Sequence, residues 1–383
     1  MKPSEPLESL EPLEQEIAPP DAYMENGHAG PPQPPQAGAN GARAAHRPRW
    51  RTYTAFVLSG GGARGALQVG ALRALLEAGE RPDVVVGTSI GAWNGALLAR
   101  DPTPAGVERL AEVWLTAHPT RVLLGLEPNG HSPAMAIASS RYATYIAAAQ
   151  RLAAGHPSLY GDVGLRNFAQ AAVGELTFEE LAVPLRVIAA DITHGRRAVF
   201  STGPIAPAIL ASSAIPGIFP PVRIGDTVYV DGGILDNASI ETALALGARR
   251  LFILDVGYDE GGAGSALWLP EPEEIKEIKS NGKPARSSRG SRSGVHPLAA
   301  VLERSSQVMS RYHFDRAIAR IPRGIETHVL RIGNSSGGGA LEFEKAPEWI
   351  AAGYESARAQ LERSHVAARP AAMRVSAGGE AAE

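Results

Sequence analysis

Two glycine-rich stretches of the sequence could carry chemistry. The first, "SGGGARG", has the spacing G-x-G-x-x-G through Gly60, Gly62 and Gly65, between an apolar run and a helical pattern. Glycines let backbone amides approach an anion closely, and the helix that follows points the positive end of its dipole at the same place. The stretch is therefore typical of an anion site, for a phosphate or for the oxyanion of a transition state.

A bound dinucleotide would need more than these glycines. Its fingerprint includes an acidic residue about 20 positions on, at the end of the second strand, where it binds a ribose. Asp83 lies near that distance but begins the second apolar run, which ends instead in "GTSIG". The chain also contains no cysteine, which excludes thiolate metal sites. We therefore expect neither a cofactor nor a metal.

The second stretch, "GTSIG", places Ser89 in the pattern G-x-S-x-G between a predicted strand and a predicted helix. A nucleophile elbow requires this context, and Gly87 and Gly91 would relieve crowding in the strained turn. The amide of Ile90, the next residue, could donate to an oxyanion. Ser89 is therefore a candidate nucleophile that needs a base.

Aspartates are better placed than histidines to act as that base. Asp191, Asp231 and Asp255 each close an apolar run, and only Asp231 is followed by two glycines, which would let another loop approach the carboxylate. Burial could raise its pKa from about 3.9 far enough to take a serine proton directly. None of the downstream histidines lies in a glycine-rich loop at a strand end, although one lies in a turn; they are His194, His296, His313 and His328.

Alternating strands and helices must position these residues. The apolar runs that predict strands are "TYTAFVLSG", "PDVVVGTS", "PLRVIAADI", "RAVFST", "TVYVDGG", "RLFILDVG" and "THVLRIG". Helical patterns cover "ALQVGALRALLEAGE" and residues 104–117, 132–154, 239–247, 296–320 and 346–363. Such alternation predicts an α/β fold with a mostly parallel sheet, within one domain over residues 52–365.

Three segments have the composition of disordered chain. Residues 1–50 are rich in proline, residues 366–383 form a similar tail, and residues 259–295 form a basic, Gly/Ser-rich insertion loop. The loop is either a solvated, mobile loop or a contact for anionic lipid headgroups. Its basic residues are Lys276, Lys279, Lys283, Arg286, Arg289 and Arg292.

Charge and hydropathy limit the expected partners and location. The net charge of -3 and the lack of aromatic residues among the basic ones do not favour nucleic-acid binding. The acidic first residues lack the apolar core of a secretory signal, and no run of about 18 apolar residues could span a membrane. We expect a cytoplasmic protein with at most peripheral membrane contact.

Four blocks, in this order, resemble those of the patatin-like phospholipase family. "SGGGARG" matches its glycine-rich block and "GTSIG" its elbow. "ASSAIPGIFPPV", from Ala211 to Val222, matches an alanine-serine block that is followed by proline, and "DGG" at 231–233 matches the last block. The resemblance covers most of residues 54–258 and extends more loosely to "FEKAPEWIAAGYESARAQL", which resembles the closing helix of the family.

The resemblance implies a three-layer α/β/α fold and a lipid acyl hydrolase of the phospholipase A or lysophospholipase type. It implies a dyad without histidine, in which Ser89 is the nucleophile and Asp231 the base. The alanine-serine block, with Ser212 and Ser213, has no assigned chemistry and is expected to shape a loop beside the site. The implied oxyanion hole comprises Gly60, Gly61, Gly62, Ala63, Arg64 and Ile90.

Two departures and two alternatives accompany the resemblance. Ser59 stands where plant members often have aspartate, as in many bacterial members, and "DNASI" lacks a proline often found two residues past the asparagine. The chain could instead be an α/β-hydrolase with a Ser-His-Asp triad, or a non-catalytic lipid-binding module on a hydrolase scaffold. The lipid headgroup, the acyl chain and the oligomeric state are open at this point.

Overall fold

The structure is a computed structural model that describes residues 53–125, 147–256, 297–333 and 341–368, except for residues 149 and 152. The predicted N-terminal segment and the basic loop lie outside these residues, as does most of the predicted helix at 132–154. The last helix continues to Ala368, and the remainder of the predicted tail lies outside the described residues.

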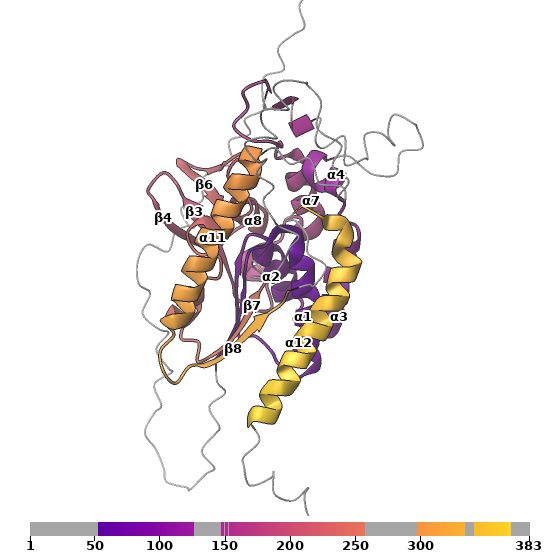
Figure 1. The fold of residues 1–383 in the computed structure, drawn as a ribbon, viewed down its shortest axis with the longest axis vertical. Coiled ribbons are helices and arrows are strands. Elements are labelled where there is room, and N and C mark those ends of the chain that lie inside the picture. Colours follow the sequence, from indigo (N-terminus) through magenta and orange to yellow (C-terminus); the bar gives the residue numbers. More distant parts are fainter. Residues whose placement is uncertain are drawn as a thin grey trace, which may run out of the picture.

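The described strands form one central sheet (Figure 1). They pair in the order β5-β6-β3-β2-β1-β7-β8, and β4 pairs with β3 as well. The run from β3 to β8 is parallel, whereas β4, β5 and β6 pair antiparallel, so the sheet is mostly parallel as predicted. The strands are β1 (Thr54–Leu58), β2 (Val84–Thr88), β3 (Leu185–Asp191), β4 (Arg196–Phe200), β5 (Val222–Ile224), β6 (Thr227–Asp231), β7 (Arg250–Asp255) and β8 (Glu326–Arg331).

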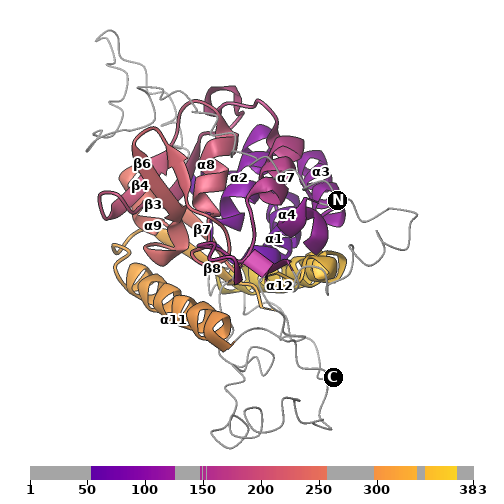
Figure 2. The same cartoon turned by 90° about the horizontal axis from the view of Figure 1, so that it is seen from above.

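Helices cover both faces of the sheet and complete the three layers (Figure 2). Successive strand residues point to opposite faces, and accordingly Phe56 and Leu58 join one core cluster while Ala55 and Val57 join the other. The first cluster packs against α1 (Gly65–Glu77), α2 (Ile90–Arg100), α3 (Pro104–Leu115), α4 (Pro119–Leu124), α7 (Val163–Val173), α8 (Ile205–Ser212) and α12 (Ala346–Ala368). The second packs against α9 (Ile240–Ala245) and α11 (Pro297–Ala319).

The helices predicted at 104–117, 239–247, 296–320 and 346–363 are confirmed as α3, α9, α11 and α12. Three described helices, α4, α7 and α8, were not predicted. The sequence of α8, "IAPAILAS", is apolar almost throughout, so no polar stripe reveals its period. Single-turn helices complete the element list at η1 (Gly62–Arg64), η2 (Phe178–Glu180), η3 (Gly232–Ile234) and η5 (Phe343–Lys345).

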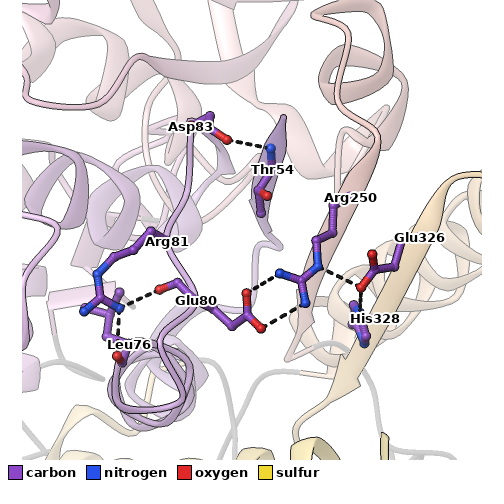
Figure 3. A network of polar contacts seen from close by, with 8 residues as sticks. All are labelled: Thr54, Leu76, Glu80, Arg81, Asp83, Arg250, Glu326 and His328. Carbon is purple, nitrogen blue, oxygen red and sulfur yellow. Dashed lines mark hydrogen bonds and ion pairs between the residues drawn. The ribbon is translucent and has the colours of Figure 1, made fainter. Parts of the chain in front are cut away.

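An ion-pair cluster lies at the amino ends of β7 and β8 (Figure 3). The Arg250 guanidinium donates to Glu80 at 2.9 Å and to Glu326 at 2.7 Å, and a ring nitrogen of His328 lies 2.8 Å from the same Glu326 oxygen. Burial raises the pKa of Glu326, but the hydrogen bonds from His328 and Arg250 outweigh it and hold that pKa below its ordinary value. The cluster therefore favours the ionised form of Glu326, and it ties the segment that follows α1 to the two strands.

Candidate active site

Ser89 occupies the turn between β2 and α2, at the carboxyl end of the strand. Its backbone has φ 55° and ψ −124°, and among the described residues it is the one non-glycine residue with a positive φ. The flanking glycines permit this turn: a Cβ on Gly91 would lie 2.2 Å from the Leu58 carbonyl oxygen, and one on Gly87 would lie 2.4 Å from the Gly91 carbonyl oxygen. The backbone therefore has the strained geometry that a nucleophile elbow requires.

The pairing of β3 explains why Ser89 and Asp231 meet although they are far apart in the sequence. β4 pairs with β3 along residues 187–191 and so occupies one edge of that strand. β2 pairs with the first half of β3 and β6 with the second, so both must share the other edge. Since β2 is parallel and β6 antiparallel to β3, they run toward each other along this edge and their carboxyl ends meet. Thr88 lies opposite Ile188, and Asp231 opposite Ala189.

Asp231 and Ser89 form a buried, hydrogen-bonded pair. Both residues are more than nine-tenths buried; the Ser89 hydroxyl donates to the carboxylate, and the Gly233 amide donates to Oδ1 at 2.8 Å. Burial raises the pKa of Asp231 to about 6, and the hydrogen bonds from Ser89 and Gly233 limit the rise. A carboxylate with this pKa is mostly ionised at pH 7 and is a stronger base than an exposed aspartate.

The glycine-rich loop passes directly beside Ser89. A Cβ on Gly60 would lie 2.4 Å from Asn237 Oδ1 and 3.1 Å from the Ser89 Cβ, so a larger residue there would have to displace these neighbours. The Gly60 amide donates to the Asn237 carbonyl oxygen at 3.1 Å, and the Arg64 amide donates to the Gly61 carbonyl oxygen at 3.3 Å. Two of the six predicted oxyanion donors therefore already have acceptors within the protein. The remaining candidates are the amides of Gly61, Gly62, Ala63 and Ile90.

A buried network of polar side chains from α1, α2 and α3 supports the glycine-rich loop. Gln68 Nε2 donates to the Ser59 carbonyl oxygen at 2.7 Å, Asn94 Nδ2 donates to Gln68 Oε1 at 2.9 Å, and Trp114 Nε1 donates to Asn94 Oδ1 at 2.8 Å. The Ser59 hydroxyl accepts from the Val256 amide at 3.1 Å. The serine that departs from the plant pattern thus ties the loop to the end of β7.

The loop after Asp231 is fixed to both β2 and β4. The Thr88 hydroxyl donates to the Asp236 carbonyl oxygen at 3.3 Å, and Arg197 Nη1 donates to the Asp236 carboxylate at 2.7 Å. Ser239, which stands at the position of the missing proline, donates its hydroxyl to the same carboxylate at 2.7 Å. Asn237 Nδ2 lies 3.4 Å from the Gly60 carbonyl oxygen. Hydrogen bonds therefore anchor this loop, with a serine in place of the proline.

The alanine-serine block contacts both members of the pair, which its sequence did not reveal. The Ser212 hydroxyl accepts from the Ser89 amide at 2.8 Å, and the Ala214 carbonyl oxygen accepts from the Asp231 amide at 3.0 Å. The Ser213 hydroxyl accepts from Trp93 Nε1 at 2.7 Å. A prediction that both serines are buried could have indicated these contacts. The stretch "ASSAIPGIFPPV" has no hydrophobic periodicity from which that burial could be predicted.

The candidate histidines within the described residues make their contacts elsewhere. The His194 ring lies 2.8 Å from Asp191, His328 belongs to the amino-end cluster, and His313 packs against Tyr312. His296 lies outside the described residues. In the described part of the chain, no group of three or more histidine or acidic side chains is arranged to hold a metal ion, and no helix is long and apolar enough to span a bilayer.

Comparisons with known proteins agree with the family resemblance. A family model described as "Patatin-like phospholipase" matches residues 56–244. "Patatin-like phospholipase domain-containing protein 7" of Rattus norvegicus is 30% identical over 225 residues, which is 56% of this chain and 15% of that protein. "Lysophospholipase nte1" of Aspergillus terreus is 30% identical over 242 residues, which is 58% of this chain and 14% of that protein. The match thus spans only a small part of these much longer relatives.

Among solved structures, that of VipD from Legionella pneumophila is similar at 16% identity and a TM-score of 0.40. The similarity covers 82% of this chain and 67% of that one. It is too low for the two sites to be compared residue by residue.

Proposed function

The chain belongs to the patatin-like phospholipase family, and from this premise we propose that it hydrolyses fatty acyl esters of phospholipids or lysophospholipids. The observation that supports the proposal is the buried pair of Ser89 and Asp231 at the facing ends of β2 and β6. Such a pair supplies a nucleophile and a base without histidine.

In the first step, Ser89 Oγ attacks the ester carbonyl carbon and its proton passes to Asp231. The hydrogen bond already present between the two side chains provides the path for that proton. The tetrahedral intermediate then collapses, the bond to the leaving alcohol breaks, and Asp231 returns the proton to the departing oxygen. The product at this stage is a fatty acyl ester of Ser89.

In the second step, water hydrolyses the acyl-enzyme. Asp231, ionised again, takes a proton from the water as its oxygen attacks the acyl carbon. The bond to Ser89 Oγ breaks, and the serine oxygen regains a proton from Asp231. A carboxylate with a pKa of about 6 suits both directions, since it is neither too weak as a base nor too weak as an acid near neutral pH.

The negative charge of each intermediate is stabilised by backbone amides beside Ser89. Gly61, Gly62, Ala63 and Ile90 are the proposed donors, from the glycine-rich loop and the first turn of α2. Preorganised amides of this kind each contribute roughly 3 kcal/mol to the transition state. Two hydrogen bonds between Gly60 and Asn237 fix the glycine-rich loop, which carries the amides of Gly61, Gly62 and Ala63.

The proposed substrates also bear on where the protein acts. Long-chain acyl esters reside in membranes, so we propose peripheral contact with a lipid surface during turnover. The cytoplasmic location stays a prediction of the sequence.

An assay with purified protein tests the function. Hydrolysis should be measured on p-nitrophenyl acyl esters and on a panel of phospholipids, lysophospholipids and neutral lipids. We expect wild type to release fatty acid from at least one lipid class and Ser89→Ala to release none above background. Equal activity in the two proteins would contradict the proposal. Lipid binding without hydrolysis by wild type would favour the non-catalytic module.

A further inference from the structure

We infer that Ser212 is a positioning residue for the nucleophile, because its hydroxyl replaces a missing rung of the sheet between Ser89 and β3. The inference rests on the proposed role of Ser89. It concerns the alanine-serine block, to which the sequence assigned no chemistry. Ser212 is completely buried and lies at the last position of α8, where its hydroxyl contacts the Ser89 amide and the Ile188 carbonyl oxygen of β3.

The register of β2 on β3 shows which rung is missing. The Val85 amide donates to the Pro184 carbonyl oxygen at 2.9 Å, following the parallel pattern in which every second amide of β2 donates to β3. Continued by four residues, the pattern would make the Ser89 amide donate to the Ile188 carbonyl oxygen. Instead, the Ser89 amide donates to Ser212 Oγ at 2.8 Å, and Ser212 Oγ donates to the Ile188 oxygen at 2.5 Å. The Ser212 hydroxyl is therefore a spacer between the Ser89 amide and the Ile188 carbonyl, which would otherwise hydrogen-bond to each other directly.

The spacer matters because Ser89 leaves the sheet at this residue. Its positive φ turns the chain away from β3, and the spacer satisfies two buried backbone groups without pulling the chain back. Without the hydroxyl, either both groups lose a partner or the Ser89 amide moves toward Ile188. Each outcome shifts Ser89 Oγ relative to Asp231, which is fixed by its own strand. Misplacement of a reacting group by about 1 Å can reduce the rate by about 100-fold.

The neighbouring residues separate this role from general packing. Asp231 is held by the Ala214 carbonyl, a backbone group that substitution at Ser212 does not remove. Ser213 is also buried, but its hydroxyl accepts from Trp93 on α2 and not from the elbow. Ser213→Ala therefore deletes a buried hydroxyl from the same segment without touching the missing rung, and it serves as the matched control.

The test compares wild type, Ser212→Ala and Ser213→Ala by the pH profile of kcat/KM, by kcat and KM, and by thermal unfolding. For Ser212→Ala we expect kcat to fall by about 10- to 100-fold with KM little changed. We also expect its acidic limb to move to higher pH, because a weaker hydrogen bond from Ser89 leaves the pKa of Asp231 higher. Ser213→Ala should leave the acidic limb in place.

Three outcomes would overturn the inference: an unchanged kcat and acidic limb in Ser212→Ala, the same shift in Ser213→Ala, or a loss that appears in KM alone. If Ser212→Ala does not fold, Ser212→Cys keeps a side chain of similar shape with a weaker, longer donor. It should show a smaller fall in kcat and a smaller shift of the limb, and wild-type values for both would overturn the inference. Failure of the proposed function would differ, since wild type itself would then hydrolyse no ester.

Discussion

The two ends of the central sheet shift the pKa values of their carboxylates in opposite directions. At the amino ends of β7 and β8, Arg250 pairs with Glu80 and Glu326, and the pKa of Glu326 is held below its ordinary value. At the carboxyl ends, the hydrogen bonds described for Asp231 come from two neutral donors, the Ser89 hydroxyl and the Gly233 amide, and its pKa is raised to about 6. The contacts of Glu326 therefore favour its ionised form, whereas the burial of Asp231 disfavours ionisation.

This difference separates stability from chemistry. A carboxylate paired with arginine contributes to stability but is a poor base, because its proton affinity is lowered. A buried carboxylate with only neutral partners costs stability when it ionises, yet it is ready to take a proton. Substitutions at the two ends should consequently have different effects: activity is lost at one end and stability at the other.

The largest effect is expected at the carboxyl end. Ser89→Ala removes the proposed nucleophile and should lower kcat by about 10⁴- to 10⁶-fold, the range known for loss of a nucleophilic serine. The free energy of unfolding should change little, since the hydroxyl contributes only one hydrogen bond. Steady-state kinetics and urea denaturation on the same preparation measure both. Residual activity within tenfold of wild type would assign the chemistry to another residue.

The acidic limb of the rate profile is the next largest effect. Because the pKa of Asp231 is raised to about 6, kcat/KM should be constant near pH 8 and fall about tenfold per pH unit below pH 6. The fall follows from protonation of the base as the pH decreases. A limb near pH 4 would indicate an aspartate with an ordinary pKa and would remove the contrast between the two ends.

The amino-end cluster gives the converse prediction. Arg250→Met leaves Glu80 and Glu326 without the arginine that pairs with them. The free energy of unfolding should fall by about 1–3 kcal/mol, less than for fully buried ion pairs because these groups are partly exposed. Urea denaturation at pH 7 measures this loss, while kcat/KM below the unfolding transition should equal that of wild type. A large loss of activity in a folded Arg250→Met protein would show that the two ends are coupled.

The smallest effect separates the dyad from a triad. His194 is the candidate histidine in a turn between strands, and its ring bonds Asp191. His194→Gln should leave kcat/KM within about twofold of wild type at pH 7, because no proton passes through this residue in the proposed dyad. His296→Gln, His313→Gln and His328→Gln provide the same comparison at the other candidate sites. Loss of several decades of rate in any of the four would favour a triad.

The sequence predicted the strand ends but not how they meet. Ser89 and Asp231 each follow an apolar run and are flanked by glycine, a local pattern that can be read directly. Their proximity depends on β2 and β6 sharing one edge of β3, which is set by register between distant strands. Strand register is a tertiary property, and no short stretch of sequence encodes it.

The contacts that support the site could not be predicted from the sequence either. Ser212 acts through a hydroxyl that replaces a backbone hydrogen bond, so its residue type alone carries no signal. The carbonyl of Asn237 occupies the Gly60 amide, which reduces the predicted set of oxyanion donors. Helix α8, which presents Ser212, was missed because it is apolar around most of its circumference.

Replacement of Asp231 by asparagine tests the central claim most directly, because two quantities should change in opposite senses. The folded pKa of about 6 lies above the reference value of 3.8, so the native state binds the proton more tightly and stability falls as the pH rises from about 4 to 6. The neutral, isosteric Asp231→Asn avoids this loss and should be more stable than wild type by about 1–3 kcal/mol at pH 7, with little gain at pH 4.

The measurement is urea denaturation at pH 4 and pH 7, with kcat determined at pH 7 on the same samples. We predict that Asp231→Asn is more stable at pH 7 and slower by at least about 10³-fold. A variant that hydrolyses esters within tenfold of the wild-type rate, or that loses stability at pH 7, would contradict the assignment of Asp231 as the buried base of Ser89.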